Sequence, residues 1–145
     1  MVSHGQCLKE NAKENSLMFN SIAWQGFERI VGELFKMHDY SVEISKVVVK
    51  EKMKRQFDVI ARKNGKTLLI DCKKWNKNRY KTSALKTAVE KQVERTVFYP
   101  GLNKTPLIVT WYDEDLVFHN KVPVVPVGRL NDFLTRIEDF DLERF

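Results

Sequence analysis

The sequence predicts an α/β domain with a mixed central β-sheet flanked by helices. Two amphipathic helical patterns enclose three successive strand-like segments. An Asn-Gly pair within those segments marks a tight hairpin turn. Another strand-like segment follows the second helix, which then acts as a crossover connection on the sheet. The expected element order is α-β-β-β-α-β, followed by a short strand and a closing helix.

Each element is predicted from its own pattern of apolar residues. Helical periodicity covers residues 21–36, 82–98 and 129–137. Strand-like runs, rich in β-branched and apolar residues, cover 40–49, the hairpin within 57–75, 105–111 and 122–127. Pro123 and Pro126 lack backbone N–H donors, so we expect the last strand to lie at an edge of the sheet.

Length and composition are those of one globular unit. The chain has 145 residues, 43% of them hydrophobic and 30% charged, enough for a single cored domain. We expect an N-terminal arm or short helix over residues 1–19 and one domain over 20–145. The sequence has no apolar run near the roughly 18 residues of a membrane span, no signal-peptide core, and two cysteines without framework spacing. We therefore expect a cytoplasmic protein without a membrane partner.

The hairpin "FDVIARKNGKTLLIDCKKW" places acidic residues in an apolar setting. With Asn64 and Gly65 as a two-residue loop, Asp58 lies directly opposite Asp71. Alternation puts six residues on one apolar face, expected to be core: Phe57, Val59, Ala61, Leu68, Ile70 and Cys72. The other face carries the two acids and Lys73.

Opposed carboxylates repel each other across a sheet, and burial makes the repulsion more costly. A divalent cation bound between Asp58 and Asp71 would remove the penalty. Lys73 alone would offset part of it, so an ion-paired cluster and a metal site both remain open. Oxygen ligands without histidine or paired cysteine favour Mg²⁺ or Mn²⁺ over zinc.

A third carboxylate borders the apolar stripe of the first helix. At 100° per residue, Glu28 lies at the edge of that stripe, whereas Glu33 lies on the polar side. Glu28 is either part of a site on the sheet or the partner of Lys36 or a strand lysine in a surface salt bridge.

These residues carry a family resemblance. The string "FERIVGELFKMHDYSVE…FDVIARKNGKTLLIDCKKW" resembles the PD-(D/E)xK, or restriction-endonuclease-like, nuclease superfamily. It is most similar to Mrr-type restriction endonucleases and archaeal Holliday junction resolvases, over roughly residues 20–135. Phe57 stands where the superfamily has a nominal proline, and His38-Asp39-Tyr40 replaces a glycine turn.

The resemblance implies a Mg²⁺- or Mn²⁺-dependent DNA endonuclease, either junction-directed or restriction-type. Asp58, Asp71 and the Cys72 backbone carbonyl would bind the metal, Glu28 would bind it directly or through water, and Lys73 would serve the attacking water or the phosphate. The alternatives are a non-catalytic nucleic-acid-binding module of the same fold and a metal-binding regulatory domain. The chain would act as a homodimer or with a separate specificity subunit.

A basic segment indicates a polyanionic partner such as DNA. Thirteen Lys or Arg face three acids between Lys46 and Lys81, whereas eight acids face four bases from Asp113 onward. After the third strand, cations alternate with aromatic residues suited to phosphates and bases: Lys74, Trp75, Lys77, Arg79, Tyr80 and Lys81. The alternative is a solvated loop with Trp75 covering the core. Gln92, on the second helix's apolar stripe, is an accessory site residue or a core-edge amide bonded to backbone.

Overall fold

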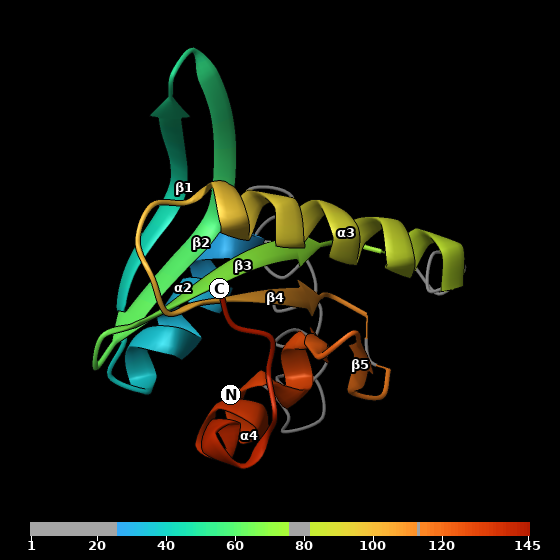
Figure 1. Cartoon of the computed structure of the whole chain (residues 1–145). Coiled ribbons are helices and arrows are strands. Elements are labelled where there is room, and N and C mark those ends of the chain that lie inside the picture. Colours follow the sequence, from blue (N-terminus) through green and yellow to red (C-terminus); the bar gives the residue numbers. More distant parts are fainter. Residues whose placement is uncertain (1–25, 76–81, 113) are drawn as a thin grey trace, which may run out of the picture.

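A computed structural model describes residues 26–75, 82–112 and 114–145. Several predicted features lie outside these residues. They are the arm over 1–19, positions 21–25 of the predicted first helix, and Lys77, Arg79, Tyr80 and Lys81. Figure 1 shows one sheet with helices packed against it. The strands are β1 (Ser41–Lys50), β2 (Met53–Lys63), β3 (Lys66–Lys73), β4 (Lys104–Thr110), β5 (Val117–His119) and β6 (Val122–Pro126). The helices are α2 (Phe27–Met37), α3 (Thr82–Phe98) and α4 (Val127–Thr135), and a 3-10 turn follows at Ile137–Asp139.

The sheet is mixed, as the sequence predicts, with strand order β1-β2-β3-β4-β6-β5. β1, β2 and β3 form an antiparallel meander. α3 then crosses over so that β4 pairs parallel to β3, and β6 pairs parallel to β4. A crossover is required here because parallel neighbours cannot be joined by a tight turn.

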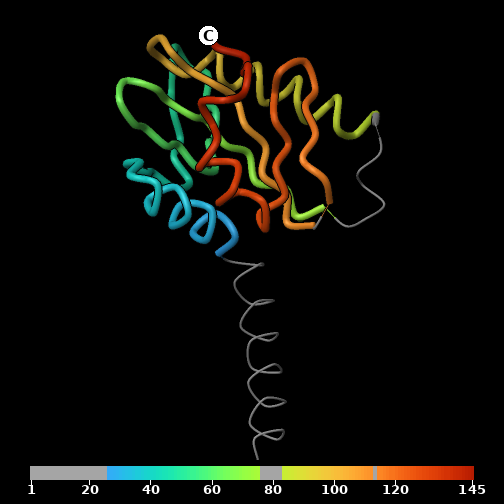
Figure 2. Tube along the Cα trace, turned by 90° about the horizontal axis from the view of Figure 1, so that it is seen from below, coloured from blue at the N-terminus to red at the C-terminus, as the bar shows by residue number. Residues whose placement is uncertain are grey.

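Helices cover both faces of the sheet (Figures 1 and 2). α2 and α4 share one core with strand residues that include Val59, Ile70 and Val109. α3 packs on the opposite face, where Ala88 and Val89 meet strand residues of β4 and β6. Adjacent residues of the central strands thus point into different cores, which explains why β4 and β6 are buried throughout.

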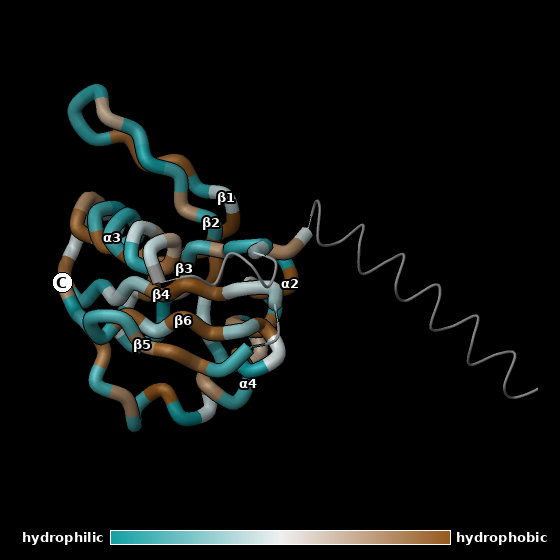
Figure 3. Tube along the Cα trace, turned by 90° about the vertical axis from the view of Figure 1, so that its right-hand side faces the viewer, coloured by the Kyte–Doolittle hydropathy of each residue, from teal (hydrophilic) through white to brown (hydrophobic). Residues whose placement is uncertain are grey.

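The hydropathy of the chain follows these layers (Figure 3). Apolar residues concentrate in the central strands, and the hairpin formed by the outer part of β1 and β2 is largely hydrophilic. Within the described residues, no helix has both the length and the apolar character needed to cross a membrane.

The edge position of β6 is a prediction that the structure contradicts. β6 lies between β4 and the three-residue strand β5, which was not predicted because so short a run carries no periodicity. His119 is the last residue of β5. The prolines are tolerated because Pro123 precedes the first β4–β6 pair and Pro126 forms the last one.

Phe57 also departs from its predicted face. It packs with Ile60, Leu69 and Tyr99 on the α3 side, with its ring 5.3 Å from that of Tyr99. The cause is a break in the β1–β2 ladder between the Ile44–Val59 and Lys46–Phe57 pairs. Ser45 adopts a left-handed conformation there, with φ of 53°, so the alternation of β2 side chains is not continuous across the break.

Candidate active site

The β2–β3 hairpin has the predicted register. Asn64 and Gly65 form the turn with φ values of 50° and 77°. Paired residue numbers sum to 129 from Lys63–Lys66 to Val59–Ile70, where the ladder ends. Asp58 and Asp71 occupy the next facing positions, at the point where the two strands separate.

The Asp58 side chain accepts a hydrogen bond that the β2 backbone would otherwise accept from β3. Phe57 and Cys72 would form the next hydrogen-bonded pair, but β2 has already turned away from β3. The Cys72 N–H instead donates to Asp58 Oδ2 at 2.8 Å. Since strand N–H groups lie in the plane of the sheet, the Asp58 carboxylate reaches across that plane toward β3. Ladder divergence, rather than a simple shared face, brings Asp58 to Asp71.

The site holds Asp58 in an environment that disfavours its negative charge. Burial raises the pKa of Asp58 from 3.8 to about 7, the Cys72 N–H opposes this shift, and the charge and hydrogen bonding of Asp71 add to it. Glu28 contributes a smaller effect of the same sign. Such an uncompensated cluster of carboxylates is typical of functional sites.

Asp71 and Lys73 form an ion pair at the end of β3. Lys73 Nζ lies 3.3 Å from Asp71 Oδ2, and the Asp71 side chain is 10% exposed. Among the described residues, this buried oxygen accepts no hydrogen bond of good geometry. With Lys73 as its partner, Asp71 can still accept further hydrogen bonds. Lys73 also leaves the charge of Asp58 unbalanced.

Glu28 reaches the same region from the first turn of α2. Ser45 Oγ, at the ladder break, donates to Glu28 Oε2 at 3.4 Å. The salt bridge considered as an alternative is not formed within the described part of the chain, because Lys36 pairs with Glu33 at 3.2 Å. Ser45 was missed by sequence reasoning. Its only signal is a polar residue in a run of β-branched ones.

Cys72 lies between Asp71 and Lys73 on β3, and its N–H bonds to Asp58. Its thiol packs against the α2-side core, as expected. Burial raises the thiol pKa well above its usual value, the charges of Asp58, Asp71 and Glu28 raise it further, and Lys73 lowers it. All four residues are thus close enough to act on one sulfur atom.

The described residues fit a divalent cation, although they do not form a closed cage for one. No group of three His, Cys, Asp or Glu side chains is positioned as a metal site in the described ranges. The fit rests on the disfavoured charge of Asp58 and on the buried Asp71 Oδ2, which pairs with Lys73 but accepts no well-formed hydrogen bond. Mg²⁺ commonly binds through one or two carboxylates and keeps several waters, so two acids are sufficient.

The family model for the Mrr-type catalytic domain, described as a restriction endonuclease, matches residues 19–99. This region contains the site and more than half of the chain. The chain belongs to the Mrr-type restriction endonuclease family. An uncharacterized protein of Archaeoglobus fulgidus is 33% identical over 117 residues, which are 79% of this chain and 91% of the relative.

Two solved structures are similar to this chain. The crystal structure of VC1899 from Vibrio cholerae aligns with a TM-score of 0.51 and 15% identity, covering 79% of this chain and 33% of that one. The crystal structure of AF1548, a protein of unknown function, aligns with a TM-score of 0.45 and 19% identity, covering 57% and 44%. This chain thus spans a third of VC1899 and less than half of AF1548, and its likeness to VC1899 concerns the fold alone.

An open hollow lies beside Lys73. It is lined by Lys73, Trp75, Ser83, Ala84, Thr87, Ala88 and Lys91. Lys74 is exposed. Trp75 packs partly on the α3-side core, which agrees with the alternative considered for it, while also facing the hollow. Thr87 and Lys91 had no distinguishing sequence signal.

Gln92 is an amide bonded to the backbone, the second of the two roles considered for it. It is fully buried on α3, and its Nε2 donates to the Leu69 carbonyl at 2.8 Å. This bond ties α3 to β3 two residues before Asp71. Among the described contacts, Gln92 acts on the backbone and not on the four site residues.

Proposed function

We propose that the chain is a DNA endonuclease that requires Mg²⁺ or Mn²⁺. The observation that carries this proposal is the pair of crowded carboxylates, Asp58 and Asp71, with Lys73 beside them. A purely structural cluster would be balanced, whereas here the buried Asp71 Oδ2 has only the ion pair with Lys73 and no well-formed hydrogen bond. Family membership supports a nuclease role for the chain.

In this proposal, Asp58 and Asp71 hold the metal together with the Cys72 backbone carbonyl. Glu28 contributes directly or through a water, held in place by Ser45. When bound, the metal lowers the pKa of a coordinated water and balances charge on the phosphate. Asp58 also keeps β2 and β3 at their point of separation through its bond to Cys72.

Lys73 acts at the reacting atoms. Its ammonium lies 3.3 Å from Asp71 Oδ2, so it can donate to an oxygen held at the same carboxylate. That oxygen is the attacking water or a non-bridging oxygen of the phosphate. The water oxygen bonds to phosphorus and gives up a proton to solvent, while the bond from phosphorus to the leaving sugar oxygen breaks and that oxygen takes up a proton from solvent. Lys73 offsets the negative charge that develops on the phosphate oxygens.

The surroundings of the site suit a nucleic-acid strand. We assign phosphate contacts to Lys74 and stacking to Trp75 beside the hollow. The remaining predicted contacts, Lys77, Arg79, Tyr80 and Lys81, belong to the same proposal. Specificity would come either from pairing two copies on a symmetric junction or from a separate subunit.

The test uses purified protein and four DNA substrates: matched duplex, single strand, flap and four-way junction. We expect cleavage only with Mg²⁺ or Mn²⁺, and a reduction on the order of a hundredfold or more for Asp71→Asn. Mn²⁺ titration followed by electron paramagnetic resonance should show binding to wild type that Asp71→Asn loses. Asp141→Asn removes a surface acid paired with Lys121 and should change neither result.

Wild-type protein that binds these DNAs without cutting any of them would favour the non-catalytic module. If Asp71→Asn binds Mn²⁺ as wild type does, the assignment of Asp71 as a metal ligand is wrong.

A further inference from the structure

Beyond the ladder break, β1 and β2 continue as a two-stranded arm, residues 46–57. Its pairs run from Lys46–Phe57 to Lys50–Met53. Figures 1 and 3 show the arm projecting away from the sheet and its helices. At about 3.4 Å per residue, the four steps between these five pairs give a length of about 14 Å.

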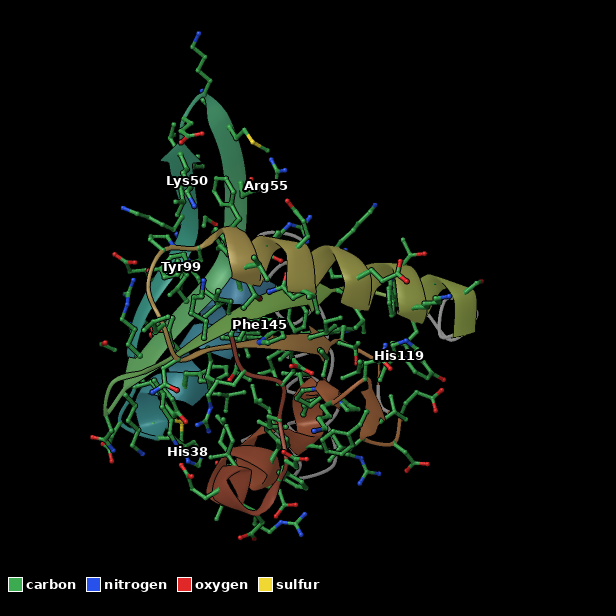
Figure 4. The ribbon with its side chains drawn as sticks, viewed as in Figure 1. His38, Lys50, Arg55, Tyr99, His119 and Phe145 are labelled. Atoms are coloured by element: carbon green, nitrogen blue, oxygen red, sulfur yellow. The ribbon has the colours of Figure 1, made fainter. Side chains whose placement is uncertain are left out.

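The arm is strongly basic. It contains four exposed lysines and one acid, Glu51 at the tip: the lysines are Lys46, Lys50, Lys52 and Lys54. Within the described residues none of these lysines forms an ion pair, in contrast to Arg55. The Arg55 guanidinium lies 2.9 Å from Glu94 and 5.2 Å from the Phe98 ring centroid. Figure 4 shows Lys50 and Arg55 on the two strands of the arm. Arg55 thus anchors the arm to α3, and the lysines remain available to a partner.

The arm does not contribute to the core along most of its length. Three apolar side chains remain exposed, Val47 by 50%, Val49 by 60% and Met53 by 51%. Its turn residues Glu51 and Lys52 have φ of 55° and 73°, a conformation that favours glycine or asparagine. An isolated two-stranded hairpin is marginal in water. Stability alone therefore does not account for the arm.

DNA fits the shape and charge of the arm. The major groove of B-DNA is about 12 Å wide and admits a two-stranded β-ribbon, with phosphates along both of its edges. The lysines come from both strands and the tip, so they can reach both edges. A second copy of the chain would bring the same positive arm, and the two arms would repel.

We propose that the arm, residues 46–57, is a DNA-binding ribbon that enters a groove of the substrate duplex. This rests on the proposed function. The arm leaves the sheet at Phe57, directly beside Asp58, so a duplex held at the carboxylates lies within its reach. The lysines contact phosphates, and Val47 and Val49 meet the apolar sugar and base edges within the groove. The arm lies within the basic stretch between Lys46 and Lys81, and it is a different element from Lys74 and Trp75, which follow β3.

The test compares two variants with the same loss of positive charge. The arm variant carries Lys46→Gln, Lys50→Gln, Lys52→Gln and Lys54→Gln. The control variant carries four substitutions at paired surface cations away from the arm: Lys36→Gln, Lys66→Gln, Lys121→Gln and Arg136→Gln. Binding to a 30-base-pair duplex is measured by fluorescence anisotropy in EDTA over a range of NaCl concentrations.

We expect the arm variant to bind at least about tenfold more weakly at 100 mM NaCl. The slope of log affinity against log salt should fall by about two to four, since each lost phosphate contact removes about 0.9. The control variant should keep the wild-type slope. Val47→Thr with Val49→Thr should weaken binding at every salt concentration without changing the slope.

An arm variant with the wild-type affinity and slope would overturn the inference, provided that circular dichroism shows it folded. Loss of self-association by the arm variant in sedimentation, with DNA binding intact, would instead identify the arm as a contact between copies. Cleavage by the wild type with Mg²⁺ is measured in parallel. Its absence would contradict the proposed function, while the binding comparison tests the arm independently of cleavage.

Discussion

Lys73→Ala should lower the rate of DNA cleavage on the order of a hundredfold or more. The side chain lies 3.3 Å from Asp71 Oδ2, at the place assigned to the attacking water and the phosphate. Loss of a group that transfers a proton or offsets developing charge typically costs 10²–10⁴ in rate. Single-turnover cleavage at saturating protein measures this rate without a contribution from binding. DNA affinity should change by about threefold or less, since one cation among many is removed.

Lys66→Ala is the matched control, because Lys66 begins the same strand and pairs with Glu138 on the surface. It should cleave at the wild-type rate. If Lys73 only neutralises the acids, Lys73→Ala would cut normally, and the metal-free protein would lose stability that Mg²⁺ restores. Near-normal cleavage by this variant would therefore refute the assigned role.

Without metal, the protein should lose stability as the pH rises from about 4 to about 7. The folded-state pKa of Asp58 is about 7, against 3.8 for the exposed group, so the folded state binds more protons in this window. The free energy of unfolding then falls with increasing pH. The loss should be on the order of 2 kcal/mol, less than the full pKa shift implies, because Asp58 is partly exposed to solvent.

Urea unfolding in EDTA across this pH range gives the measurement. Other carboxyl groups titrate in the same range, so the difference between wild type and Asp58→Asn isolates Asp58. Asparagine keeps an oxygen to accept the Cys72 N–H but cannot ionise, and its curve should lack the decline. Mg²⁺ at pH 8 should stabilise wild type and not Asp58→Asn. Parallel curves for the two proteins would show that Asp58 does not carry the unfavourable charge.

The sequence alone determined the parts of this protein that depend on neighbouring residues. Asn64-Gly65 set the hairpin register, because a two-residue turn leaves only one way to pair its strands. The register placed Asp58 opposite Asp71. The second helix was predicted over its observed bounds, Thr82–Phe98, since its apolar repeat and the following Pro-Gly are local signals. Local motifs also indicated the family.

Only the tertiary structure decided the features that depend on distant pairing. Phe57 changed faces, and Asp58 turned toward the Cys72 N–H, because β1, β2 and β3 diverge at Ser45 and Asp58. Side-chain alternation holds only along an unbroken ladder, and sequence periodicity does not reveal a break. Likewise, β6 became an interior strand through β5, whose three residues gain order from pairing and not from their own pattern. The basic arm, residues 46–57, was not predicted for the same reason. The sequence indicated its strands, but not that they would extend beyond the core.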